Sequence, residues 1–202
     1  MPFTEANFEN AILEIFRDLL GYETLYGPDV VRDFAEPLCL EMLDEALVRL
    51  NPSLPRAAID EAIARIRNIE SGSLARKNAR FTDMLQNGVA VNYFDGSEQR
   101  AGLVRLVDYD LPMRNRFTVA NQWTVEERSV RRADIVVFVN GLPLVVVELK
   151  SPSREATDVS EAYAQLRNYM QEIPSLFVYN AFCVMSDLAT TKAGTCLLYT
   201  SP

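Results

Sequence analysis

Two acids and a lysine stand at the ends of one almost wholly apolar stretch of the chain, residues 134–150. Asp134 opens this stretch, and Glu148 and Lys150 close it. Burying such charges among apolar side chains is costly unless something compensates them. A divalent metal ion between the carboxylates is the simplest compensation, and a metal, two acids and a lysine together suit phosphodiester hydrolysis.

The stretch predicts a β-hairpin, and the alternation of side chains tests whether the acids can meet. Directly opposed residues of an antiparallel pair share a face of the sheet. A strict two-residue turn at Asn140-Gly141 would oppose Asp134 to Val147 and leave Glu148 on the other face. A three-residue loop (140–142), or a bulge there, opposes Asp134 to Glu148 instead. We therefore predict an odd loop or a bulge at this turn, which brings the three charged side chains to one end of the sheet.

The remaining residues of the hairpin are apolar on both faces. One face carries Ile135, Val137, Val139, Val145 and Val147, and the other carries Val136, Phe138, Leu144 and Val146. This pattern predicts central strands covered by helices on both sides, as in a layered α/β domain. On these residues alone, a core hairpin whose ends happen to be charged is about as good an interpretation as a metal site.

The segment after the hairpin, residues 157–173, predicts a helix that adds two polar groups to the site. Ala162, Leu166, Tyr169, Met170 and Ile173 recur at helical spacing. Gln165 and Tyr169 are four residues apart, so they are neighbours on the helix surface.

Together these residues resemble the PD-(D/E)xK nuclease superfamily, and more closely the N-terminal nuclease domain of type I restriction enzyme R (HsdR) subunits. The likeness lies in Asp134, the Glu148-Leu149-Lys150 run and the Gln-x-x-x-Tyr spacing, and Ala133 departs from the proline in the motif's name. Further stretches similar to the family are Thr4-Glu5, Leu20-Gly21-Tyr22, Tyr26-Gly27-Pro28-Asp29, Val184-Met185-Ser186-Asp187 and Ala193-Gly194-Thr195.

The resemblance implies a fold and a set of roles. The fold is α/β, a restriction-endonuclease-like mixed β-sheet core flanked by helices, forming one domain over residues 1–195 with a helical insert at 37–88. Asp134 and Glu148 would bind Mg²⁺, with the Leu149 carbonyl as a further ligand. Lys150 would orient or deprotonate the attacking water, or stabilise charge on the phosphate. Gln165 and Tyr169 would position Lys150 or the substrate backbone.

In the wider superfamily a glutamate of the first helix can approach the metal, which makes Glu5 and Glu9 candidates here. An exposed acid near a helix N-terminus is the more ordinary interpretation of either residue.

The implied function is that of an Mg²⁺-dependent DNA endonuclease, a type I site-specific deoxyribonuclease, with DNA and the methyltransferase and specificity subunits of a restriction complex as partners. ATP belongs to full-length R subunits only, because this chain has no phosphate-binding loop motif. Two alternatives stay open: another nuclease of the superfamily, resolvase-like or for repair, and a non-catalytic interaction module with a nuclease fold.

Composition sets the outer limits. The chain has 202 residues, no histidine, three cysteines and a net charge of −8. Zinc sites and histidine triads are thereby excluded, and strong DNA binding by the chain alone is disfavoured. The lack of a signal peptide or a long apolar run favours a cytoplasmic location. The candidate phosphate contacts are Arg128, Arg131 and Arg132, and, with less support, Arg76, Lys77 and Arg80.

Periodicity predicts the remaining elements. Thr4 caps a helix to residue 20, with a buried stripe of Phe8, Ala11, Ile12, Ile15, Phe16 and Leu19. An extended piece at 23–26 is followed by helices at 37–50, 55–69 and 73–87. Strands are predicted at 89–94, 103–109, 117–125 and 176–185. The tail, residues 196–202, departs from the family pattern and is expected to reflect truncation or an added sequence.

Overall fold

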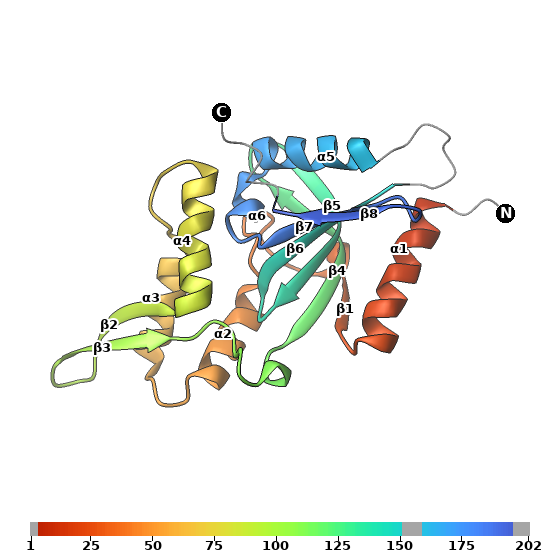
Figure 1. The fold of residues 1–202 in the computed structure, drawn as a ribbon. Coiled ribbons are helices and arrows are strands. Elements are labelled where there is room, and N and C mark those ends of the chain that lie inside the picture. The colour runs from red at the N-terminus through yellow and green to blue at the C-terminus, as the bar shows by residue number, and fades with distance from the viewer. Residues whose placement is uncertain (1–3, 151–158, 196–202) are drawn as a thin grey trace.

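A six-stranded mixed β-sheet forms the centre of the protein, which we describe from a computed structural model for residues 4–150 and 159–195 (Figure 1). The strand order is β1-β4-β5-β6-β7-β8. The β1/β4 and β6/β7 pairs are parallel, and the other pairs are antiparallel. The strands are β1 (Glu23–Tyr26), β4 (Phe117–Glu126), β5 (Val130–Val139), β6 (Leu142–Leu149), β7 (Phe182–Ser186) and β8 (Thr191–Gly194).

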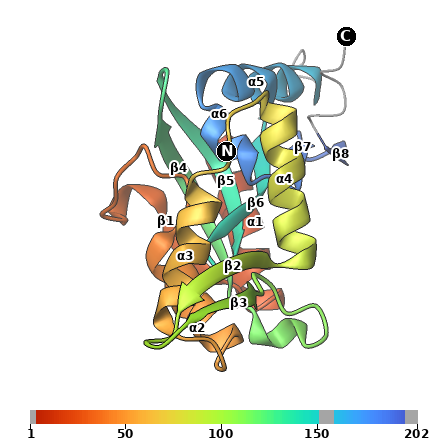
Figure 2. The ribbon, with the colours of Figure 1, turned by 90° about the vertical axis from the view of Figure 1, so that its left-hand side faces the viewer.

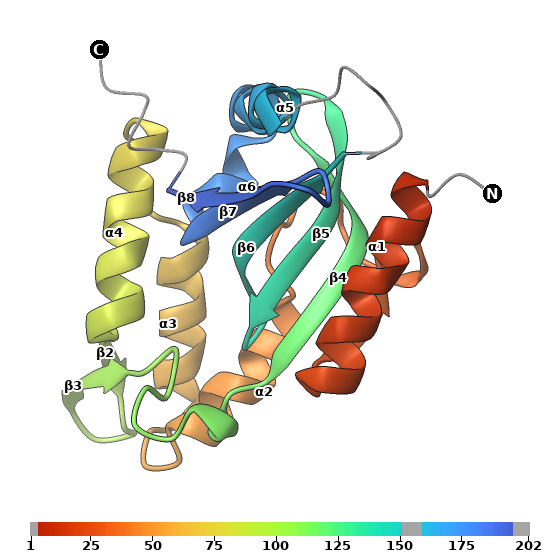
Figure 3. The ribbon, with the colours of Figure 1, turned by 45° about the vertical axis from the view of Figure 1, so that its right-hand side comes forward.

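Helices cover both faces of this sheet, as the apolar pattern of the hairpin predicted. Helix α1 (Glu5–Glu14) lies against one face and helix α5 (Val159–Glu172), followed by α6 (Pro174–Val178), against the other (Figure 3). The core on the α1 side is built from residues such as Ile135 and Val147, and the core on the α5 side from residues such as Val136 and Val146. The fold is therefore a mixed α/β, restriction-endonuclease-like fold.

A second group of elements stands to one side of the large sheet (Figures 1 and 2). It contains α2 (Leu40–Leu50), α3 (Arg56–Arg67), α4 (Leu74–Asn87) and a small sheet of β2 (Val89–Phe94) and β3 (Gln99–Val104). The Ser73 side chain caps α4, and Gly88, at φ 83°, ends it. The helices predicted at 37–50, 55–69 and 73–87 are confirmed, and they share with the small hairpin a core that also includes Leu142 of β6 and Val178 of α6.

The β5–β6 hairpin contains the predicted irregularity. The turn itself has two residues, Asn140 and Gly141, at φ 53° and 80°, the left-handed pair that a tight hairpin turn requires. A register shift at Val137/Phe138 then changes the pairing, so that Val137 opposes Val145 and Ile135 opposes Val147. The bulge is thus confirmed, whereas the three-residue loop, the other form allowed by the sequence, does not occur.

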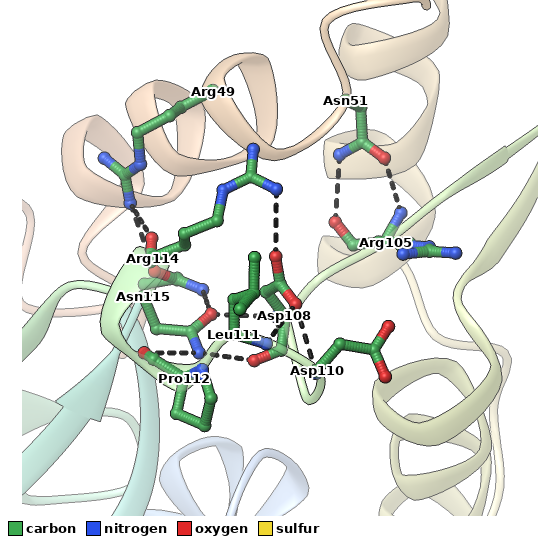
Figure 4. Close-up of polar contacts among 10 residues, drawn as sticks. Arg49, Asn51, Arg105, Asp108, Asp110, Leu111, Pro112, Arg114 and Asn115 are labelled. Atoms are coloured by element: carbon green, nitrogen blue, oxygen red, sulfur yellow. Dashed lines mark hydrogen bonds and ion pairs between the residues drawn. The ribbon is translucent and has the colours of Figure 1, made fainter.

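The turn is held by the segment that joins β3 to β4. In that segment Asp108 accepts hydrogen bonds from the Leu111 backbone N–H at 2.9 Å and from Arg114 Nη1 at 3.1 Å (Figure 4). The amide of Asn115 donates to the Asp108 carbonyl at 2.8 Å, and its oxygen accepts from the fully buried amide of Asn140 at 2.9 Å. Buried polar groups satisfied in this way fix the turn and, with it, the register of the hairpin.

Three expectations about the elements are wrong. The second strand of the small hairpin covers Gln99–Val104 rather than residues 103–109, because a four-residue loop at 95–98 sets a tighter register. The region 176–185 is not one strand, since Pro174 starts a short helix and extended backbone returns only at Phe182.

The third wrong expectation concerns the first helix. Thr4 caps it, with Asn7 completing the reciprocal pair of hydrogen bonds. The α-helix ends at Glu14 and continues as a turn of π-helix, Ile15–Leu19. In this turn Phe16 still packs against the core on the α1 side of the sheet, whereas Ile15 and Leu19 are 47% and 78% exposed.

No helix within residues 4–150 and 159–195 is long and apolar enough to cross a membrane. The unusual tail, residues 196–202, and the start of the predicted 157–173 helix lie outside the described residues.

Candidate active site

The register of β5–β6 places the two candidate metal ligands opposite one another on neighbouring strands. Ile135 opposes Val147, and Asp134 and Glu148 are the next residues along β5 and β6 from that pair. Asp134 Oδ2 accepts a hydrogen bond from the backbone N–H of Leu149 at 2.8 Å. Its carboxylate is therefore turned toward β6, beside Glu148.

Glu148 is fully buried, at 0% exposure. Its Oε1 accepts a hydrogen bond from Lys150, but no donor within the described residues reaches Oε2. Burial, and next the charge on Asp134, raises the pKa of Glu148 to about 8, against the opposing effect of Lys150. A buried carboxylate oxygen with no donor, beside a second carboxylate, is a site that a cation would stabilise.

The Lys150 ammonium group joins the hairpin to α5. Its Nζ lies 2.9 Å from Glu148 Oε1 and 2.7 Å from Gln165 Oε1. The Lys150 side chain is 13% exposed and lines the cavity described below. An ammonium group has three N–H donors, and these two contacts use two of them.

Gln165 and Tyr169 continue this chain of hydrogen bonds along α5. Gln165 Nε2 donates to the Tyr169 hydroxyl at 2.6 Å, and that hydroxyl donates to the Arg132 carbonyl at 3.1 Å. Burial, and next the charge on Glu148, raises the pKa of Tyr169, which keeps the phenol neutral and able to donate. The structure thus brings together all five residues that the sequence singled out.

A polar cavity of about 1190 Å³ opens between α5 and the ends of the strands, and Asp134, Lys150 and Gln165 are among the residues that line it. Arg131 and Arg132 also lie on its wall. Arg131 is neutralised by a paired contact with Glu172, whereas within the described part of the chain Arg132 makes no ion pair.

The other basic candidates lie elsewhere. Arg128 donates to the Gln171 carbonyl at 3.1 Å, and Arg80 pairs with Glu70 at 2.8 Å. Neither residue, nor Arg76 or Lys77 on α4, lines this cavity.

The described residues contain no cluster of three or more acids, cysteines or histidines, so any metal here would depend on the carboxylates of Asp134 and Glu148. That donor set suits Mg²⁺, which prefers oxygen ligands and retains several waters. The carboxylate of Glu9 is already used, because it accepts from Asn121 Nδ2 and Gln122 Nε2, both at 2.6 Å. The side chain of Glu5 lies outside the described residues.

Sequence reasoning missed Asn121 and Gln122. Both lie in the middle of β4, and Gln122 lines the cavity across from Asp134. The available signal was a pair of adjacent amides in the middle of a largely buried strand, where alternation allows only one of them to face a given core.

The fold and this site together define a restriction-endonuclease-like domain with a pair of carboxylates and a lysine on its central hairpin. Residues 2–200 match the family described as the type I restriction enzyme R protein N terminus. The chain belongs to this family.

Relatives agree over most of the chain. It is 39% identical over 185 residues to the type I restriction enzyme HindI endonuclease subunit of Haemophilus influenzae, a match that covers 87% of this chain and 18% of the relative. It is 30% identical over 196 residues to a Methanocaldococcus jannaschii chain provisionally named the type I restriction enzyme MjaIXP endonuclease subunit. That match covers 92% of this chain and 19% of the relative. The chain spans about one fifth of the length of these relatives.

Proposed function

We propose that this chain is the PD-(D/E)xK endonuclease domain of a type I restriction enzyme R subunit and hydrolyses phosphodiester bonds of DNA with Mg²⁺. The observation that supports this best is the buried Glu148 oxygen that no donor of the described residues reaches, beside Asp134 and Lys150, which themselves line an open polar cavity. A purely structural core would gain nothing from leaving that oxygen without a donor.

Asp134 and Glu148 would hold the metal ion, with the Leu149 carbonyl as a further ligand. When bound, Mg²⁺ lowers the pKa of a coordinated water and polarises the scissile phosphate. The raised pKa of Glu148 describes the chain without metal, and a bound cation would favour the ionised carboxylate.

Lys150 acts by donating hydrogen bonds. Two of its N–H groups hold Glu148 Oε1 and Gln165 Oε1, which leaves the third for a phosphate oxygen or the attacking water at the cavity wall. This arrangement favours a role in stabilising developing negative charge over a role as a base. Gln165 and Tyr169 fix the direction of the ammonium group, since Tyr169 is itself anchored on the Arg132 carbonyl.

Partner subunits of this chain would bring DNA to the cavity. The net charge of −8 gives the chain little affinity for a polyanion of its own. We propose that the methyltransferase and specificity subunits of a restriction complex, together with the ATP-driven part of a longer R subunit, deliver the DNA.

The test is Mg²⁺-dependent DNA cleavage by the assembled complex containing either the wild-type chain or Asp134→Ala. We expect Asp134→Ala to abolish cleavage while the complex still assembles and binds DNA. The matched control is Asp83→Ala, which removes an exposed acid of α4 far from the cavity and should cleave like wild type. Equal cleavage by Asp134→Ala and wild type would favour the non-catalytic module. Specific cleavage without the partner subunits would favour another nuclease of the superfamily.

A further inference from the structure

Strand β4 is interrupted opposite Asp134. Asn121 pairs with Ile135, and Trp123 pairs with Ala133, but the intervening position, Gln122 opposite Asp134, is missing from the ladder. The backbone of Gln122 has φ 54°, a left-handed conformation that a residue other than glycine adopts at a cost.

Both strands change face at this interruption. Ala120 and Trp123, three residues apart on β4, point into the same core on the α5 side. Ala133 and Val136, three residues apart on β5, do the same. In regular strands residues three apart lie on opposite faces, so each strand contains one position that breaks the alternation.

Two contacts from outside the strand hold this conformation. The Glu9 carboxylate on α1 accepts from the side-chain amides of both Asn121 and Gln122 at 2.6 Å, which keeps two consecutive residues pointing to one side. Gly27 packs against the same backbone, since a Cβ there would lie 2.5 Å from the Gln122 carbonyl oxygen and 2.8 Å from that of Asn121. A strained conformation persists only where its surroundings determine it in this way.

We propose that Glu9, Gly27 and Gln122 form a positioning assembly for Asp134. In an unbroken ladder the Asp134 side chain would stand away from the plane of the sheet. Here it turns toward the next strand, where Oδ2 accepts from the Leu149 N–H beside Glu148. The assembly thereby sets the spacing of the two carboxylates. This inference rests on the proposed metal-dependent function and assigns a role to residues that do not contact the metal.

The first test compares two glycines. Gly27→Ala places a methyl group against backbone oxygens that cannot move without shifting Gln122, whereas Gly194→Ala, the matched control, adds one in open space. We expect Gly27→Ala to weaken the binding of Mn²⁺ and Mg²⁺, measured by titration calorimetry well below the melting temperature, by about tenfold to a hundredfold. Gly194→Ala should bind both ions like wild type.

The second test distinguishes positioning from direct ligation by Glu9. Glu9→Ala should weaken metal binding because Gln122 loses support for its left-handed backbone. Gln122→Gly should lose less metal affinity than Glu9→Ala, because glycine adopts that conformation without help. The double variant should then bind more tightly than Glu9→Ala alone, a non-additive result that a Glu9 acting as a metal ligand would not give.

The outcomes separate this inference from the proposed function. If wild type and Asp134→Ala give the same metal titration, no divalent metal binds at Asp134 and the proposed function fails. If wild type binds metal and both Gly27→Ala and Glu9→Ala bind it within about twofold of wild type, the positioning assembly is overturned. If Gly27→Ala does not fold, the Glu9 and Gln122 cycle decides alone: strictly additive losses in that cycle contradict the inference.

Discussion

Lys150 Nζ bridges Glu148 Oε1, at 2.9 Å, and the helix α5 through Gln165 Oε1, at 2.7 Å. The ammonium group therefore satisfies one oxygen of the buried carboxylate, and in the described part of the chain the other oxygen has no donor. Burial, and next the charge on Asp134, raises the pKa of Glu148 although a lysine contacts it, and a cation bound here would favour the ionised carboxylate. Four predictions test how the surrounding groups support this arrangement.

The first prediction concerns the pH dependence of stability. In the metal-free folded chain the pKa of Glu148 is raised from its ordinary value of 4.5 to about 8. Between these values the folded state holds a proton that the unfolded state has released, so this group's contribution is complete below pH 4.5 and is lost as pH rises through 8. The loss is at most about 1.36 kcal/mol per pH unit over that window. Glu148→Gln should remove this slope.

Urea unfolding of wild type and Glu148→Gln in a metal chelator, at about pH 5.5 and about pH 8, measures the difference. We expect the variant to gain stability relative to wild type as pH rises, with the other titrating groups cancelling in the comparison. A difference that stays constant across pH would contradict the prediction. Adding Mg²⁺ at the higher pH should stabilise wild type more than the variant.

The second prediction concerns the hydrogen-bond chain along α5. Tyr169→Phe removes the hydroxyl that accepts from Gln165 and donates to the Arg132 carbonyl. We expect a loss of about 1–2 kcal/mol in the free energy of unfolding, because a largely buried amide is left without a partner. DNA cleavage by the assembled complex should also fall, since Lys150 loses part of its support.

A double-mutant cycle with Gln165→Ala provides the control for this prediction. The two losses should be strongly non-additive, because either substitution alone breaks the same chain of hydrogen bonds. Independent, additive effects would show that Tyr169 acts only by filling the core.

The third prediction compares two neighbouring arginines. Arg131 is neutralised by Glu172, whereas Arg132 lines the cavity without an ion pair in the described residues. Arg132→Ala should weaken DNA binding by the complex and reduce the salt dependence of its affinity, by about 0.9 in the logarithmic slope for one lost phosphate contact. Arg131→Ala is the matched control and should change both quantities less. DNA affinity measured over a range of salt concentrations shows which variant has the larger effect. A larger effect of Arg131→Ala would mean that Arg131, and not Arg132, contacts the phosphate.

The fourth prediction concerns the turn that sets the hairpin register. Asn140 is fully buried at φ 53°, and its amide donates to the Leu106 carbonyl and to Asn115 Oδ1. Asn140→Ala should lower the free energy of unfolding more than Asn140→Gly, by about 1–2 kcal/mol, because glycine loses the same hydrogen bonds but tolerates the left-handed backbone. Chemical denaturation of the two variants gives the comparison directly. Equal losses would mean that the hydrogen bonds alone hold the turn.

The order of helices and strands was largely readable from the sequence because it depends on local chemistry. Thr4 and Ser73 cap helices with their own side chains, and Gly88 ends one in a left-handed conformation. One error occurred where a single apolar run allows both a strand and a helix. The region 176–185 is apolar enough for a strand, but packing against α4 and α5 selects a short helix for its first part.

By itself the sequence determined that Asp134, Glu148 and Lys150 lie at the ends of one hairpin and that Gln165 and Tyr169 share a helix face. Alternation along a strand and the spacing of a helix are properties of the backbone, so they can be counted along the chain. Only the tertiary structure decided that one Glu148 oxygen meets no donor from residues 4–150 and 159–195, that Lys150 is shared between two elements, and that β4 breaks opposite Asp134. These features depend on which side chains and backbone atoms, distant in the sequence, come into contact. The spacing of residue types along the chain does not specify those contacts.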